Sequence, residues 1–351
     1  MNIICTGISC SGRRELMEEF EAFCVQKELN IGFFNVGDFI HSIAAKSDVH
    51  FTEKVLDSDP VVLSLARRNA FYEIARRAEA YEHAIIGLHT CFRWRGTLIE
   101  GFSFEDIEII PPDLFINVVD NITDISTRME ETTQWAGMGK ATLNVWLDEE
   151  ELLTRQLAKF SKKRHYTIVR QQEFDDFYEL LFSSKPKFYL SYPIVMLEET
   201  PEEIQKIREL GEKLQHSFIV FDPLSIQDME LIASAEGRSE GKQSMPTTIG
   251  EMDEYVDVVE QIKTRTISRD YQFIHQSDFM VVIYPTDKLS PGVLSEMNYA
   301  AHHNKPVYAL YTGARSIFFE KLCERIFDTF EELVDFLNTT YQASAPRERE
   351  K

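Results

Sequence analysis

A continuous apolar run near the carboxyl end of the chain, FMVVIY at residues 279–284, most constrains the fold. An apolar run of this length without alternation is typical of a strand that a parallel sheet buries on both faces. The run is followed by a loop, DKLSPG, by a helical segment, VLSEMNYAAHH, and by a second apolar run at 307–311. This order of strand, loop, helix and strand predicts one βαβ unit of an α/β domain.

The length of the chain, 351 residues, suits two domains. The amino-terminal half alternates strand and helix signals, with strands predicted at 2–6, 32–36, 83–89, 114–119 and 165–169. The polar stretch SSKPK, at 183–187, is the best candidate for a linker. We therefore predict two doubly wound α/β domains with parallel sheets, at 1–183 and 186–341, and a tail at 342–351.

Three further segments carry local predictions. Residues 148–160 are expected to form a helix with an acidic first turn, and 319–337 are expected to close the second domain as a helix. The polar, glycine-containing stretch at 233–250 is expected to be a loop near a site.

The charge of the chain narrows the classes of partner. Asp and Glu number 58 against 37 Lys and Arg, a net charge of -21, which disfavours attraction to nucleic acid or an anionic membrane. No segment approaches the roughly 20 apolar residues of a membrane span, and the amino terminus lacks the basic stretch of a signal peptide. The five cysteines show no metal-site spacing and no disulfide framework. We expect a cytoplasmic protein without a metal site.

A candidate phosphate-binding loop, GISCSGRR at 7–14, follows the first predicted strand and precedes a helix. Gly7 and Gly12 have the spacing of the motif G-x-x-x-x-G-K-[ST], in which backbone N–H groups and a helix amino terminus bind phosphate. Arg13 stands at the lysine position and Arg14 at the position of the magnesium-binding hydroxyl. Because arginines bind phosphate bidentately, we expect Gly7, Gly12, Arg13 and Arg14 to contact a nucleotide.

Together with NVGDFI, AIIGLHTCFRWRGTLIEGF and PDLFINVVDNITDISTRM, this loop makes residues 1–180 resemble the adenylate-kinase-like nucleoside monophosphate kinases. In that family the strand matching AIIGLH ends in an Asp that supports the metal, and Gly87 stands at this place. With Gly87, Arg13 and Arg14 at these positions, phosphoryl transfer lacks two of its usual electrostatic supports. An active kinase, a nucleotide-binding pseudo-kinase and a purely structural domain all remain open.

Residues 186–340 resemble the nucleoside 2-deoxyribosyltransferase superfamily, which includes the 2′-deoxynucleoside 5′-monophosphate N-glycosidases. The resemblance rests on FYLSYPI, SRDYQFIHQSDFMVVIY and SPGVLSEMNYAAHHNKPVYAL. The family has an Asp before a helix, a second Asp that opens the next strand, and a Glu nucleophile in a G-[TV]-x-x-E motif. These positions fall on Asp270, Asp278, and Gly292 with Glu296.

The resemblance implies that Glu296 is the nucleophile, that Asp270 is the general acid/base, and that Tyr189, Asp278, Ser290 and Gly292 contact the substrate. One carboxylate can attack the anomeric carbon while another acid protonates the departing base, so the chemistry needs no cofactor. Structural roles are the alternative for both residues: a Glu in the first turn of a helix interacts favourably with the helix dipole, and an Asp before a helix often caps it.

The identity of the substrate stays open. Ser290 matches the place where the monophosphate-specific branch contacts the 5′-phosphate, and the transferases often carry an Asp there. The first loop, SYPIVML, lacks the glycines and arginines of the monophosphate glycosidases. Free nucleosides and 5′-monophosphates therefore both remain candidates, as do water and a second base as acceptor. The resemblance also implies a homo-oligomer.

Our first hypothesis is thus an enzyme that cleaves or exchanges the N-glycosidic bond of a nucleoside or nucleoside 5′-monophosphate, with the amino-terminal domain binding a nucleotide. One alternative is a non-catalytic nucleotide sensor, in which neither domain performs chemistry. The other is a working nucleoside monophosphate kinase.

Overall fold

The structure is a computed structural model that describes residues 1–46, 51, 54–197, 200–226 and 249–342. The predicted loop at 233–250, except its last two residues, and the predicted tail, except residue 342, lie outside this part. The chain divides into two compact units, Met1–Gln171 with Ile226–Arg265, and Gln172–Ser225 with Thr266–Lys351. The domain boundaries at 183 and 186 stay a prediction.

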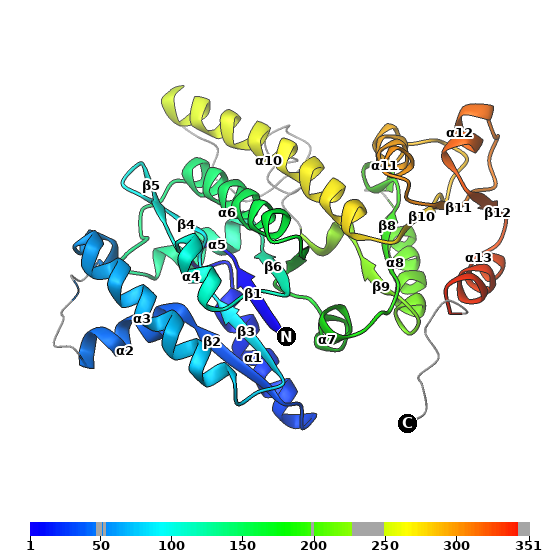
Figure 1. Cartoon of the computed structure of the whole chain (residues 1–351). Coiled ribbons are helices and arrows are strands. Elements are labelled where there is room, and N and C mark those ends of the chain that lie inside the picture. The colour runs from blue at the N-terminus through cyan, green and yellow to red at the C-terminus, as the bar shows by residue number, and fades with distance from the viewer. Residues whose placement is uncertain (47–50, 52–53, 198–199, 227–248, 343–351) are drawn as a thin grey trace, which may run out of the picture. The chain divides into compact units, whose positions relative to one another are not determined.

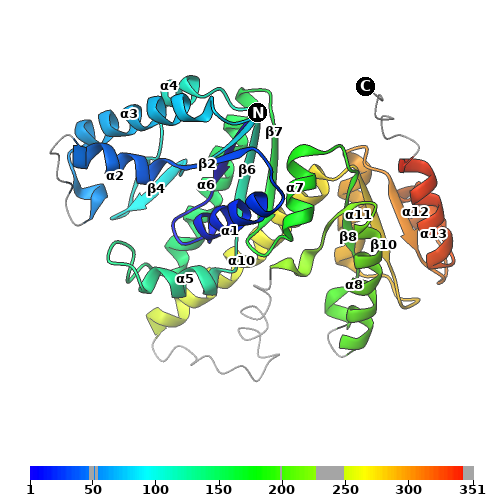
Figure 2. The ribbon, with the colours of Figure 1, turned by 90° about the horizontal axis from the view of Figure 1, so that it is seen from below.

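The first unit is built on a five-stranded parallel sheet in the order β2-β3-β1-β6-β7, with helices on both faces (Figure 1, Figure 2). Its strands are β1 (Asn2–Thr6), β2 (Ile31–Asn35), β3 (His83–Gly87), β6 (Leu114–Val119) and β7 (Arg164–Val169). From β1 the chain proceeds to β2 and β3 on one side and later to β6 and β7 on the other. This reversal confirms the predicted doubly wound fold, and the loop after β1 lies at the switch point where such sheets bind ligands.

Helices cover this sheet through apolar contacts. They are α1 (Arg13–Gln26), α2 (Val36–Lys46), α3 (Pro60–Ala78), α4 (Phe104–Ile109), α5 (Ile122–Glu130) and α6 (Lys140–Phe160). Phe71 of α3 and Leu157 of α6 pack with Ile4 and Phe115 of the strands in one buried cluster. On α1, Phe20 makes an edge contact with Phe33 of β2, with ring centroids 6.0 Å apart. Every residue of β6 is buried, so strand side chains on both faces of the sheet are covered, as expected of a central parallel sheet.

Two features of this unit differ from the predictions. The antiparallel hairpin of β4 (Cys91–Trp94) and β5 (Thr97–Glu100) was not predicted. Its two turn residues, Arg95 and Gly96, have φ of 51° and 77°, the positive values that a type I′ hairpin turn requires. In addition, α6 begins at Lys140, so the acidic residues at 148–151 lie inside the helix and do not form its first turn.

The second unit is built on another five-stranded parallel sheet, in the order β12-β11-β10-β8-β9. Its strands are β8 (Lys187–Ser191), β9 (Ile219–Phe221), β10 (Phe279–Ile283), β11 (Val307–Leu310) and β12 (Arg325–Phe327). The chain proceeds from β8 outward to β9 and returns to β10 on the other side of β8. The switch point of this sheet therefore lies between β8 and β10, at their carboxyl ends.

The helices of the second unit are α7 (Phe174–Phe182), α8 (Pro201–Gln215), α11 (Pro291–His302), α12 (Ile317–Leu322) and α13 (Phe330–Leu337), together with the end of α10 (Ile249–Gln276). The prediction of one closing helix over 319–337 is wrong. Cys323 adopts extended backbone angles, β12 pairs with β11, and the Thr329 side chain accepts from the Glu332 amide to start α13. An added edge strand thus interrupts the segment.

The helices of the described ranges include none that is both long and apolar enough to span a membrane.

Candidate functional site

Glu296 lies in the second turn of α11, which follows β10, beside the switch point of the second sheet. The Tyr189 hydroxyl donates to its Oε1 at 3.3 Å, and the Ser191 hydroxyl donates to its Oε2 at 2.5 Å. Both donors come from β8, where side chains two residues apart point to the same face. Each oxygen of the carboxylate is therefore held by a hydroxyl group.

A second carboxylate, Asp270, belongs to the same unit. Its side chain is 13% exposed, and its Oδ1 accepts from Nε and Nη2 of Arg269 at 3.3 and 3.2 Å. Arg269 is itself fixed by donating from Nη2 to the Pro223 carbonyl at 3.4 Å. Asp270 was predicted to lie before a helix, which is wrong: it lies inside α10, six residues before the last helical residue, Gln276. Its side chain therefore does not cap a helix.

The two carboxylates perturb each other. Burial raises the pKa of Glu296, the negative charge of Asp270 raises it further, and the hydrogen bonds from Ser191 and Tyr189 lower it. Burial also raises the pKa of Asp270, against the opposing charge of Arg269. The pair thus titrates in two coupled steps and holds one proton over an intermediate range of pH.

Tyr189 is suited to remain a donor over that range. It is fully buried, and burial together with the charges of Asp270 and Glu296 raises the pKa of its phenol well above the ordinary value. An un-ionised phenol donates a hydrogen bond, so the link from Tyr189 to Glu296 persists at every pH at which the carboxylate is charged.

A third carboxylate, Asp222, follows β9. It accepts from the Tyr192 hydroxyl at 2.8 Å and from the Leu224 amide at 2.9 Å, and it pairs with Arg208 at 3.3 Å. Its negative charge contributes to the raised pKa of Asp270. Neither Asp222 nor Ser191 was predicted from the sequence, although the period of two along β8 places Ser191 on the same face as Tyr189.

Ser290 and Gly292 lie at the amino terminus of α11, one to two turns before Glu296. Ser290 is the N-cap residue, with φ of -90° and ψ of 129°, and its hydroxyl makes no capping hydrogen bond. A Cβ on Gly292 would lie 3.7 Å from the Ser290 hydroxyl, an ordinary van der Waals contact, so a small side chain would fit at this position. Both predicted positions therefore accompany Glu296 on the same helix.

Asp278, by contrast, is not brought to this group. It precedes β10 and so lies at the amino end of the strand, whereas α11 starts beyond the carboxyl end. Its Oδ2 accepts from the Lys187 amide at 2.8 Å and pairs with the Lys187 ammonium at 3.1 Å. These contacts join β10 to β8 at the amino ends of the two strands, whereas Glu296 lies beyond their carboxyl ends.

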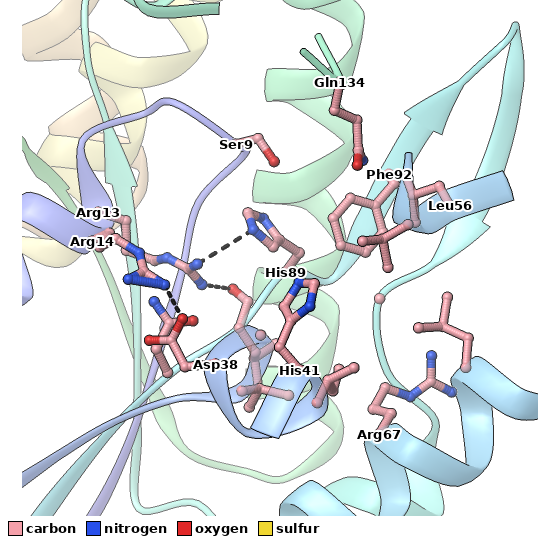
Figure 3. Close-up of a pocket in the computed structure, with 18 of the residues that line it drawn as sticks. Ser9, Arg13, Arg14, Asp38, His41, Leu56, Arg67, His89, Phe92 and Gln134 are labelled. Carbon is pink, nitrogen blue, oxygen red and sulfur yellow. Dashed lines mark hydrogen bonds and ion pairs between the residues drawn. The ribbon is translucent and has the colours of Figure 1, made fainter. Parts of the chain in front are cut away.

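The predicted phosphate-binding loop of the first unit connects β1 to α1. Gly12 is the N-cap residue of α1 with φ of 79°, a left-handed conformation that favours glycine. The buried guanidinium of Arg13 donates to the carbonyls of Leu88 and Cys5, the latter at 3.3 Å, and lies 3.3 Å from Nε2 of His89 (Figure 3). Arg13 is thus turned toward the ends of β1 and β3.

Arg14, in the first turn of α1, and Gly87, the last residue of β3, lie beside this loop. Arg14 is half-exposed and forms an ion pair with Asp38 (Figure 3). At Gly87, a Cβ would lie 2.7 Å from the sulfur of Met17 and 3.7 Å from Cζ of Arg13. An acidic side chain at this position would therefore require Met17 to move.

A pocket of about 290 Å³ adjoins the loop and includes Arg13, Arg14 and His89 in its wall (Figure 3). Arg67, Phe92 and Trp135 also line it, which combines cationic groups with aromatic faces. Arg67 is committed to Asp106, with Nε 2.8 Å from Oδ2. Its charge is therefore already balanced within the protein.

Glu150 is the main feature of this unit that was not predicted. Its buried carboxylate accepts from the amides of Gly7, Thr90 and Cys91 at 3.2, 2.9 and 3.1 Å, and from the Thr90 hydroxyl at 2.6 Å. Burial raises the pKa of Glu150, and these donors lower it. One side chain of α6 thereby binds the first residue of the loop to the segment after β3.

The chain was compared with protein-family models, with curated proteins and with solved structures. No protein-family model matches it, and no curated protein matches it. Among solved structures, it is similar to a 2-deoxyribosyltransferase from the psychrotolerant bacterium Bacillus psychrosaccharolyticus, with a TM-score of 0.26 and 16% sequence identity. That similarity covers 42% of this chain and 90% of the other.

Among the described side chains, no three of His, Cys, Asp and Glu gather as a metal-binding group.

Proposed function

We propose that the second unit cleaves or exchanges the N-glycosidic bond of a nucleoside or nucleoside 5′-monophosphate. The observation that supports this proposal most is the pair of carboxylates, in which Glu296 is held by two hydroxyl groups and lies within electrostatic reach of Asp270. Glycoside chemistry that retains configuration uses two carboxyl groups, one as nucleophile and one as acid.

In the proposed reaction, the ionised Glu296 attacks the anomeric carbon as the carbon–nitrogen bond breaks. The electron pair of that bond leaves with the base, and a proton from Asp270 neutralises it. Water or a second base then attacks the same carbon, the bond to Glu296 breaks, and Asp270 accepts the proton of the incoming group. The first route is hydrolysis and the second is exchange.

The test is base release from a panel of nucleosides and nucleoside 5′-monophosphates, with and without an acceptor base, read by the masses of the products. A new nucleoside that appears only with the acceptor identifies exchange, and a free sugar or sugar phosphate identifies hydrolysis. If no member of the panel loses its base, the proposal fails and a non-catalytic sensor takes its place.

The coupled carboxylates give an expected pH profile. Activity needs one proton on the pair, so kcat/KM should rise as the pair releases its first proton and fall as it releases its second. Asp270→Asn leaves Glu296 as the only titrating group of the pair, so the alkaline limb should vanish. Rates from about pH 4 to 9 on a substrate with a good leaving group provide the measurement. Identical limbs in the variant would contradict the assignment of Asp270.

Ser290 provides an expectation about the 5′-substituent. A free hydroxyl and the amide groups at the start of α11 form an acceptable phosphate site, and an Asp there would repel phosphate. We expect Ser290→Asp to reduce the preference for a 5′-monophosphate by about 10- to 100-fold, the cost of about 1.5–3 kcal/mol for a hydrogen bond to a charged group. The measurement is the ratio of specificity constants for a nucleoside and its monophosphate, with Ser295→Asp on the same helix as control. An unchanged ratio in Ser290→Asp would remove Ser290 from the site.

For the first unit we propose nucleotide binding without phosphoryl transfer. The loop and its pocket supply backbone amides and cationic groups, but Arg13 is held by main-chain carbonyls and Gly87 cannot support a metal. Titration calorimetry with ATP, ADP and AMP should detect binding that Arg13→Ala weakens by about 10-fold or more. Arg76→Ala, an exposed partner of Glu73, is the control. Binding heat absent for all three nucleotides would leave this unit structural, and transfer from labelled ATP would revive the kinase alternative.

A further inference from the structure

Ser191 has surroundings that a merely structural serine does not need. It is the last residue of β8, it is 0% exposed, and its hydroxyl donates to Glu296. The register of the sheet places Ser191 beside Val282 and Tyr189 beside Met280 of β10. Because paired strands of a central sheet fix the backbone of both residues, the two hydroxyl groups are presented to Glu296 in a fixed geometry.

The two hydrogen bonds are not equivalent. The contact from Ser191 to Oε2 is 2.5 Å, and the contact from Tyr189 to Oε1 is 3.3 Å, near the upper limit for such a bond. Oε2 is therefore the more tightly held oxygen, and Oε1 is the oxygen that can turn its electron pair to a substrate.

Taking the proposed glycosidic chemistry as its basis, we propose that Ser191 is a positioning residue that favours the ionised form of the Glu296 carboxylate and directs Oε1 to the sugar. The same hydroxyl then assists the second half of the reaction. It acts through Glu296 and does not itself touch the reacting atoms.

The chemistry gives Ser191 opposite effects on the two steps. When Oε1 bonds to the anomeric carbon, the carboxylate becomes an ester and its negative charge is lost, so the hydrogen bond to Oε2 weakens. When the acceptor attacks, the bond between carbon and Oε1 breaks and its electron pair returns to the carboxylate. Hydrogen bonds to charged acceptors are stronger than those to neutral ones, so Ser191 stabilises the departing carboxylate. Loss of this hydroxyl should therefore slow the breakdown of the glycosyl-enzyme more than its formation.

The experiment compares Ser191→Ala, Ser191→Thr, which retains a hydroxyl, and Ser277→Ala as matched control. Ser277 is also buried, but it precedes β10, at the amino end of that strand. Its hydroxyl donates to the Phe273 carbonyl at 2.7 Å. In protein labelled with carbon-13 at the Glu carboxyl groups, the Glu296 resonance, assigned by its loss in Glu296→Gln, is followed with pH. The same proteins are quenched during turnover of the best substrate in the nucleoside panel and weighed intact.

We expect Ser191→Ala to titrate Glu296 at higher pH, because the ionised form has lost a donor. We also expect its turnover to fall by about 10-fold or more while the mass of a glycosyl-enzyme accumulates. Ser191→Thr should restore both properties at least in part, and Ser277→Ala should change neither. An unchanged Glu296 titration in Ser191→Ala overturns the proposed role, whatever the activity of the protein. A shifted titration in a protein that cleaves no substrate would retain the ionisation role and refute the proposed function.

Discussion

Glu296→Gln is expected to reduce base release from the best substrate by about 10³-fold or more, the scale on which removal of a nucleophile acts in covalent catalysis. The amide keeps the shape of the side chain, and its oxygen can still accept from one of the two hydroxyl groups of Tyr189 and Ser191 while its NH2 group faces the other. It carries no charge and cannot form the glycosyl ester. The measurement is single-turnover release of base, which excludes product release as the slow step. Glu331→Gln, at an exposed position in the first turn of α13, is the matched control.

The same variant should be more stable than the wild type near neutral pH. The pKa of Glu296 is raised in the folded state, so above an unfolded pKa of about 4.3 the folded protein holds a proton that the unfolded chain has released. Stability therefore falls as the pH rises from that value through the folded pKa, and Glu296→Gln removes this loss. A gain of about 1 kcal/mol near pH 7, absent near pH 4, is expected from unfolding curves. Wild-type turnover in a folded Glu296→Gln protein would show that another group is the nucleophile.

The sheets could be predicted from the sequence because their central strands are apolar and short. FMVVIY at 279–284 corresponds to β10, and the predicted strands at 2–6 and 114–119 agree with β1 and β6. The edge strand β12 could not be found in this way. It has three residues, is exposed at Arg325, and lies between two segments with helical periodicity. Its pairing with β11 overrides the local preference of this segment for helix, as is common at the edge of a sheet.

The candidate site was predictable to the extent that a motif marks it. Glu296, Asp270 and Tyr189 were predicted, and the structure places them within electrostatic reach of one another. Ser191 carries no motif, since a serine at the end of a strand is unremarkable until the register of β8 and β10 is known. Ser290 and Gly292 were predicted to lie in a loop before a helix that starts at Val293, whereas α11 begins two residues earlier, at Pro291, so Gly292 lies in its first turn.

Glu150 escaped prediction for a different reason. It lies within a run of four acidic residues, and such a run is typical of a solvated helix face. The apolar spacing of α6 contains the contrary signal, because Leu143, Trp146, Leu147, Thr154 and Leu157 are buried at helical intervals. Extending that spacing puts Glu150 on the buried face, and Glu149 and Glu151 beside it. A buried acid among backbone donors can be recognised only once the helix is known to begin at Lys140.

We expect Glu150→Ala to destabilise the first unit by about 3–5 kcal/mol. The substitution leaves the amides of Gly7, Thr90 and Cys91 and the Thr90 hydroxyl without their acceptor. Each buried donor left unsatisfied costs about 1–3 kcal/mol, although these costs do not add fully because water enters the space. Glu150→Gln keeps one acceptor oxygen and should lose less.

Denaturant unfolding followed by tryptophan fluorescence measures this loss in the relevant unit, because all three tryptophans, at 94, 135 and 146, belong to it. The adjacent Glu149→Ala provides a control of the same residue type on the same helix. Glu149 pairs with Arg93 at a partly exposed position, where an ion pair contributes about 0–1 kcal/mol. Equal losses in Glu149→Ala and Glu150→Ala would show that the carboxylate of Glu150 is not needed to join the loop after β1 to the segment after β3. A loss confined to Glu150→Ala would show that an acid supplied by α6 satisfies Gly7 in the folded loop, so that Gly7 is held before any nucleotide arrives.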